Sequence, residues 1–60
     1  MSFDRREKIL GLLRKQGVVM LKDLEQLFPD VSSMTLRRDL EFFENLGEAV
    51  RIRGGARYIQ

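Results

Sequence analysis

Two adjacent arginines, Arg37 and Arg38, stand in a segment whose apolar residues have the spacing of a helix. Leu36, Leu40 and Phe43 fall on one stripe of that helix at about 100° per residue, which places both arginines on the other side. A guanidinium group is planar and permanently charged, and it donates two parallel hydrogen bonds to a phosphate, a carboxylate or the edge of a guanine. The two arginines are therefore either solvated charges on a helix surface or contacts to a negatively charged partner.

A second group of arginines lies near the end of the chain. Arg51, Arg53 and Arg57 occur between Ala49 and Gln60, a stretch that contains no acid. The whole chain has a net charge of only +2, from 11 Lys and Arg against 9 Asp and Glu. A basic segment beside the arginine pair on a nearly balanced chain predicts one positive face, which is typical of a nucleic-acid-binding surface.

The composition leaves little room for catalysis or metal binding. The 60 residues include no cysteine and no histidine, which removes disulfides, thiolate and imidazole metal ligands and the commonest nucleophile–base pairs. Carboxylates remain, but a chain of this length forms one small domain with little space for an enclosed pocket around them. We therefore expect no catalytic residues, no cofactor and no metal. No apolar run is long enough to cross a bilayer and no signal peptide opens the sequence, so we expect a cytoplasmic protein without a membrane partner.

The first half of the chain predicts two helices with a short strand between them. The first helix is predicted over residues 2–17, with Gly17 at its C-terminal end. Ile9, Leu12, Leu13 and Gln16 share one face of it, with Phe3 and Leu10 beside them. The β-branched stretch VVML at 18–21 predicts one or two rungs of a strand. A second short helix ends at Pro29, and its apolar residues are Leu21, Leu24, Leu27 and Phe28.

The second half predicts a third helix and a hairpin. The Val31 side chain is expected to pack beneath the turn that precedes this helix. The Ser32 hydroxyl can accept a hydrogen bond from a backbone N–H in the first turn of the helix. Gly47 ends the helix, after which the apolar period changes to about 2 and Gly54–Gly55 offers the positive φ angles of a hairpin turn. We expect replacement of both glycines by valine to disorder the hairpin and spare the three-helix core. The fold predicted is mainly α with a small β-hairpin, a three-helix winged helix-turn-helix.

The stretch VSSMTLRRDLEFFENLGEAVRIRGGA resembles the N-terminal DNA-binding domain of the DeoR family of bacterial transcriptional regulators. The residues that carry the resemblance are Val31–Ser32, Thr35–Leu36–Arg37–Arg38–Asp39–Leu40, Gly47, Arg51 and Gly54–Gly55–Ala56. The upstream helices also resemble those of the family, so the likeness covers nearly the whole chain. Three positions depart from it: Met20 stands where a serine often caps the second helix, Pro29 resembles a one-residue insertion, and Arg53 replaces the usual histidine.

The resemblance implies sequence-specific binding of double-stranded DNA. Residues 33–46 would form a recognition helix in the major groove, and the wing at 49–60 would contact the flanking backbone or the minor groove. The residues expected to touch DNA are Ser32, Ser33, Met34, Thr35, Arg37, Arg38, Arg51, Arg53 and Arg57. The resemblance further implies a repressor of a carbohydrate-metabolism operon. Family members normally carry a C-terminal sugar-phosphate-sensing domain, so we expect residues 1–60 to form the DNA-binding domain alone. We expect this domain to be a monomer. A full-length regulator is expected to form homo-oligomers through its C-terminal domain.

Several alternatives stay open at this point. Arg38 can pair with Glu41 along the helix, and Thr35 can hold the helix start instead of touching DNA. Asp39 is poorly suited to contact DNA and is expected to orient a nearby arginine. Phe42 packs under the wing or against a second copy, of which we expect the former. For the whole domain the alternative is a winged helix that binds another protein, because this fold also serves as an interaction module.

Overall fold

The three predicted helices are present: α1 (Ser2–Gln16), α2 (Leu21–Leu27) and α3 (Ser33–Asn45). The computed structural model describes residues 2–59, with side chains from residue 4 onward. The predicted place of the Phe3 side chain and the last wing residue, Gln60, lie outside the described part. The predicted third helix ran to residue 46, and in the structure Leu46 is the residue that follows its last turn. Within residues 2–59, no helix is long and apolar enough to span a bilayer.

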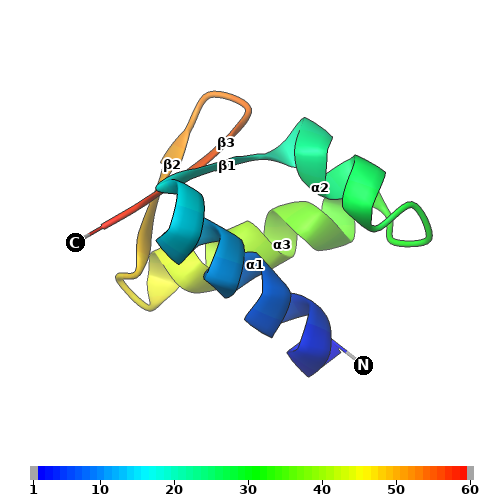
Figure 1. Ribbon diagram of the computed structural model, residues 1–60, viewed down its shortest axis with the longest axis horizontal. Helices are drawn as coiled ribbons and strands as arrows, with labels where there is room; N and C mark the ends of the chain where they lie inside the picture. The colour runs from blue at the N-terminus through cyan, green and yellow to red at the C-terminus, as the bar shows by residue number, and fades with distance from the viewer. Residues whose placement is uncertain (1, 60) are drawn as a thin grey trace.

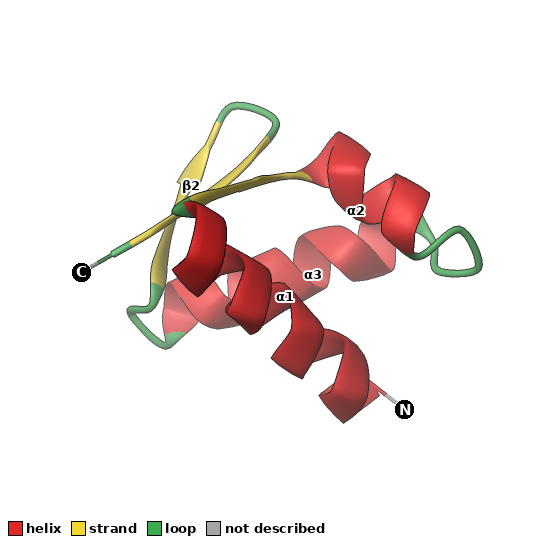
Figure 2. Cartoon of the chain, viewed as in Figure 1, coloured by secondary structure: helices red, strands yellow, loops and turns green. Residues whose placement is uncertain are grey.

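The strands form one antiparallel sheet at the end of the molecule where α1 finishes (Figures 1 and 2). β2 (Ala49–Ile52) and β3 (Gly55–Tyr58) are the predicted hairpin, and β1 (Val18–Met20) pairs with the free side of β3. The strand order is therefore β1-β3-β2, and the small hairpin predicted from the sequence is one part of a three-stranded sheet. This pairing anchors the wing to the segment between the first two helices.

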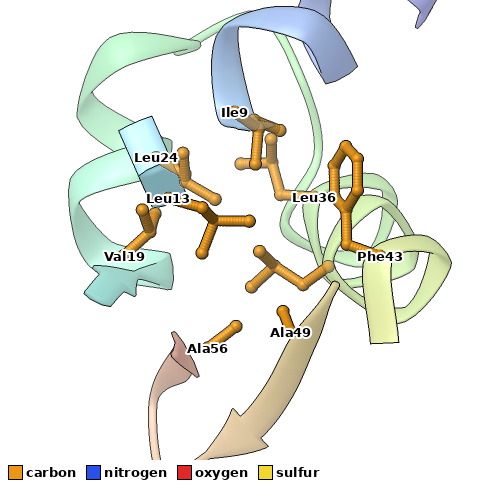
Figure 3. Packing of buried hydrophobic residues seen from close by; sticks show 9 residues of the cluster. Ile9, Leu13, Val19, Leu24, Leu36, Phe43, Ala49 and Ala56 are labelled. Atoms are coloured by element: carbon orange, nitrogen blue, oxygen red, sulfur yellow. The ribbon is translucent and has the colours of Figure 1, made fainter. Parts of the chain in front are cut away.

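The core lies between the helices and the inner face of the sheet (Figure 3). Its buried apolar residues are Ile9, Leu13, Val19, Leu24, Leu36, Leu40, Phe43, Ala49 and Ala56. The predicted stripe of α3 is confirmed, and Val31 packs against the core as expected. Ala49 and Ala56 are small, which allows the sheet to approach the helices closely.

Two residues of the faces predicted to turn inward lie outside the core. Gln16 is exposed at the last position of α1, and Leu27 is 57% exposed at the end of α2. At 3.6 residues per turn, Leu27 lies about 60° to one side of the buried Leu24, whereas Leu21 and Phe28 lie to its other side. The helix turns the Leu21–Leu24–Phe28 flank inward, so Leu27 faces solvent.

The turn of the wing is joined to the start of α2. The Leu21 N–H donates to the Gly54 carbonyl at 2.7 Å, while Met20, the residue before the helix, makes no side-chain cap. Of the two glycines predicted for the turn, Gly54 lies in it with a positive φ of 79°, whereas Gly55 has no positive φ and is the first residue of β3. A Cβ on Gly55 would lie 2.2 Å from the Val19 carbonyl oxygen. Because the Gly54 carbonyl holds the first N–H of α2 and Gly55 lies against β1, we now expect substitutions of these glycines to disturb the start of α2 as well as the hairpin.

We predict that Gly55→Ala lowers the free energy of unfolding by about 1–3 kcal/mol, because the new methyl group cannot fit against β1 without a backbone shift. Gly11→Ala is the matched control, since nothing lies within 4 Å of a Cβ at that helical position. It should raise the free energy of unfolding by roughly 0.5–1 kcal/mol through helix propensity alone. Urea unfolding of both variants measures the difference. Equal effects of the two substitutions would contradict the close approach of the wing to β1.

Candidate nucleic-acid interface

The start of α3 is held by three hydroxyl groups. The Thr35 N–H donates to Ser32 Oγ at 3.2 Å, which confirms the predicted cap, and the Ser32 hydroxyl donates to Thr35 Oγ1 at 2.9 Å. The Ser33 hydroxyl donates to Glu25 Oε2 of α2. These hydrogen bonds give Thr35 the helix-start role left open by the sequence, and they fix the first turn of α3 against α2. DNA contact by these three residues stays a prediction.

The side of α3 opposite the core presents the residues predicted to meet DNA. Met34 is 64% exposed, and Arg37, Arg38 and Glu41 are also exposed. Among residues 2–59, ion pairs involve Asp39 alone among the acids, so the alternative pairing of Arg38 with Glu41 is absent from the described structure. Both guanidinium groups are thus available to a partner outside the chain.

Asp39 is fully buried on the core side of α3 and is held by two arginines of α1. Arg5 donates from Nε to Asp39 Oδ2 and from Nη2 to Oδ1 at 3.1 Å. Arg6 donates from Nε to Oδ1 at 2.9 Å. The prediction that Asp39 orients an arginine is confirmed, but the arginines belong to α1 and were missed. A signal was present: Asp39 occupies the i+3 position of the stripe that begins at Leu36, and a buried carboxylate requires a cationic partner.

Phe42 extends this contact between α1 and α3. The guanidinium carbon of Arg6 lies 4.1 Å from the centroid of the Phe42 ring, within cation–π range. The ring also meets Phe43 edge to face, with centroids 5.3 Å apart and an interplanar angle of 78°. These contacts place Phe42 beside α1, whereas the sequence predicted packing under the wing.

The two arginines control the protonation of Asp39. Burial alone would raise the pKa of Asp39, but the hydrogen bonds and positive charges of Arg5 and Arg6 outweigh it and hold this pKa below its ordinary value. The same hydrogen bond raises the pKa of Arg5. The carboxylate therefore stays ionised in the folded protein to a lower pH than in the unfolded chain.

We predict that Asp39→Asn lowers the free energy of unfolding at neutral pH by about 1–3 kcal/mol, since it removes charge-assisted hydrogen bonds. Because the folded pKa is lowered, the stabilisation is complete above the unfolded pKa of about 3.9 and is lost as the pH falls through the folded value. The stability difference between the wild type and Asp39→Asn should therefore shrink below about pH 4. Urea unfolding across this range measures it. A difference that stays constant with pH would contradict an ionised Asp39.

The wing arginines lie on different faces of the sheet. Arg51 stands opposite Ala56, which faces the core, and its Nε donates to the Gly55 carbonyl at 3.4 Å. Arg53 is exposed at the turn. Since side chains alternate along a strand, Arg57 lies on the outer face, in one row with Val18 and Val50. The structure thus separates Arg57 from Arg51.

No group of three acidic side chains within residues 2–59 is arranged to hold a metal ion. The arrangement offers instead a helix with a fixed start and unpaired arginines, flanked by a basic hairpin. Three helices around one core, a short turn between α2 and α3, and the β2–β3 wing define a winged helix-turn-helix domain. The chain belongs to the DeoR-like helix-turn-helix domain family, whose match covers residues 5–60. It is a DNA-binding domain of the kind found in transcriptional regulators.

Curated relatives support this assignment. The chain is 46% identical over 55 residues to a putative galactitol utilization operon repressor of Escherichia coli (strain K12), covering 92% of this chain and 48% of the relative. It is 51% identical over 53 residues to a putative aga operon transcriptional repressor of Escherichia coli O157:H7, covering 88% and 19%. A lactose phosphotransferase system repressor of Streptococcus mutans serotype c is 43% identical over 54 residues, with 90% and 21% covered. The chain therefore spans about half of the first relative and about a fifth of the other two. No solved structure gives a significant match.

Proposed function

We propose that this domain reads a specific sequence of double-stranded DNA with α3 in the major groove. The observation that carries the proposal is the division of α3 into two sides. Leu36, Asp39 and Leu40 are buried, while Arg37 and Arg38 are exposed and form no ion pair within the described residues. Arginine donors in this position suit both guanine edges and phosphate oxygens.

The first turn of α3 would enter the groove ahead of the arginines. Ser32, Ser33, Met34 and Thr35 lie at the helix start, where base edges and phosphates are approached in this fold. Arg51 and Arg53 would contact the flanking backbone or the minor groove from the wing. Arg57 would reach the same parts of the duplex from the outer face of the sheet, where it is exposed.

We further propose that a protein carrying this domain represses an operon for carbohydrate use in the bacterial cytoplasm. The support is three relatives, which are named as a putative galactitol utilization operon repressor, a putative aga operon transcriptional repressor and a lactose phosphotransferase system repressor. The domain would act by binding an operator rather than by catalysis. Effector sensing and oligomerisation would belong to another domain of such a regulator.

Arg37→Ala should weaken binding to DNA by about 1–3 kcal/mol and leave the melting temperature nearly unchanged, because the side chain is exposed and unpaired. The duplex is one selected from a random library by the wild-type domain. Arg14→Ala is the matched control, since it removes the same charge from an exposed position on α1. Gel-shift titrations at several salt concentrations compare the variants, and the wild type should weaken steeply with salt.

Equal losses for Arg37→Ala and Arg14→Ala would show that the positive charge acts without a defined contact, and would contradict α3 as the reading element. Failure of the wild type to select any duplex, or an affinity independent of salt, would favour the alternative of a winged helix that binds protein.

Fusion of the domain to an unrelated dimerising segment should raise its affinity for a duplex with two half-sites by about 10²–10⁴-fold, because the second contact becomes intramolecular. Affinity for a duplex with one half-site should stay unchanged. Analytical ultracentrifugation should show the unfused domain as a monomer. A tight dimer at micromolar concentration would contradict this expectation.

A further inference from the structure

A groove of about 390 Å³ lies between α1 and the end of α2. Leu12 and Phe28 are half-buried in it, and Leu27 is 57% exposed beside them. Lys8, Gly11 and Lys15 complete the lining from α1. No residue of α3 contributes to the lining, so a ligand in this groove would leave the side of α3 that carries Arg37 and Arg38 free.

Gly11 leaves the middle of the groove open. It lies inside α1 with an ordinary helical backbone, and nothing comes within 4 Å of where its Cβ would be. A glycine in a helix interior costs roughly 0.5–1 kcal/mol relative to alanine. The missing side chain leaves open space on the α1 side of the groove, which gives an apolar side chain from outside a place to insert.

The charges of the groove are both positive. Lys8 and Lys15 are seven residues apart on one face of α1, which corresponds to about 10.5 Å along the axis. Neither is in an ion pair within the described residues. Asp4 and Glu7 line a separate hollow that Lys8 also borders, but their carboxylates are not within ion-pair distance of the Lys8 ammonium group. An apolar floor between two cations is complementary to apolar side chains between two carboxylates.

We propose that this groove docks an acidic amphipathic helix of a partner protein. Such a helix carries carboxylates at positions i and i+7 and apolar side chains at i+3 and i+4, all on one face. The carboxylates would meet Lys8 and Lys15, and the apolar pair would cover Gly11 and Leu27. A second copy of the same groove is a poor occupant, since it would set lysines against lysines. A nucleic acid backbone offers phosphates but nothing for the apolar floor.

The probe is a capped alanine-based helical peptide with Glu at two positions seven residues apart and Leu at the third and fourth positions after the first Glu. Titration into the ¹⁵N-labelled domain should shift the amide signals of residues 8–15 and 27–28. A counterpart with Gln in place of both Glu residues should bind about 3- to 10-fold more weakly, the loss expected for two exposed charge pairs.

Two substitutions at one position test the groove itself. Gly11→Leu fills it and should weaken peptide binding by about tenfold or more, whereas Gly11→Ala adds one methyl group and should keep affinity within about twofold. Both favour the helix, so both variants should fold. Both should also bind the selected DNA duplex like the wild type, which separates failure of this proposal from failure of DNA reading. Three results would overturn the proposal: no binding at about 1 mM peptide, equal affinity for the Gly11→Leu variant, or shifts confined to the outer sheet face around Val18 and Val50.

Discussion

The buried carboxylate of Asp39 is the constraint on which the orientation of α3 depends. An ionised side chain without water would cost several kcal/mol unless cations and hydrogen bonds replaced its solvation. Arg5 and Arg6 supply both, so the first turns of α1 must lie against the middle of α3. Together with the packing of Leu36, Leu40 and Phe43, these hydrogen bonds fix which side of α3 faces α1. The rotation that buries Asp39 is the one that turns Arg37 and Arg38 outward.

The same residue type thus performs two different tasks within a small domain. Arg5 and Arg6 are committed to Asp39, and Arg6 also covers the Phe42 ring. Arg37 and Arg38 have no such partner in the described residues and stay available for DNA. The wing adds to this arrangement because the Gly54 carbonyl accepts from the Leu21 N–H and β3 pairs with β1. The wing is therefore held to α2 and β1, and the Ser33–Glu25 hydrogen bond joins α2 to α3.

Local patterns explain what could be predicted from the sequence. The helical period of Leu36, Leu40 and Phe43, and the hydroxyl of Ser32 before them, act over one or two turns, so the stripe, the cap and the outward arginines of α3 follow directly. The rest depends on contacts between distant segments. The partners of Asp39 are 33 and 34 residues away. The face occupied by Arg57 depends on β1 pairing with β3, and the exposure of Leu27 depends on which flank of α2 meets the core.

The central claim is that Arg5 and Arg6 hold Asp39 while Arg37 and Arg38 bind DNA. NMR of the arginine side-chain Nε–Hε groups, recorded with and without a selected DNA duplex, tests it most directly. The Arg5 and Arg6 signals should be protected from exchange in the free protein and unchanged by DNA, because both Nε atoms donate to Asp39. The Arg37 and Arg38 signals should exchange rapidly in the free protein and become shifted and protected in the complex. DNA-dependent changes at Arg5 and Arg6, with none at Arg37 and Arg38, would contradict these separate roles.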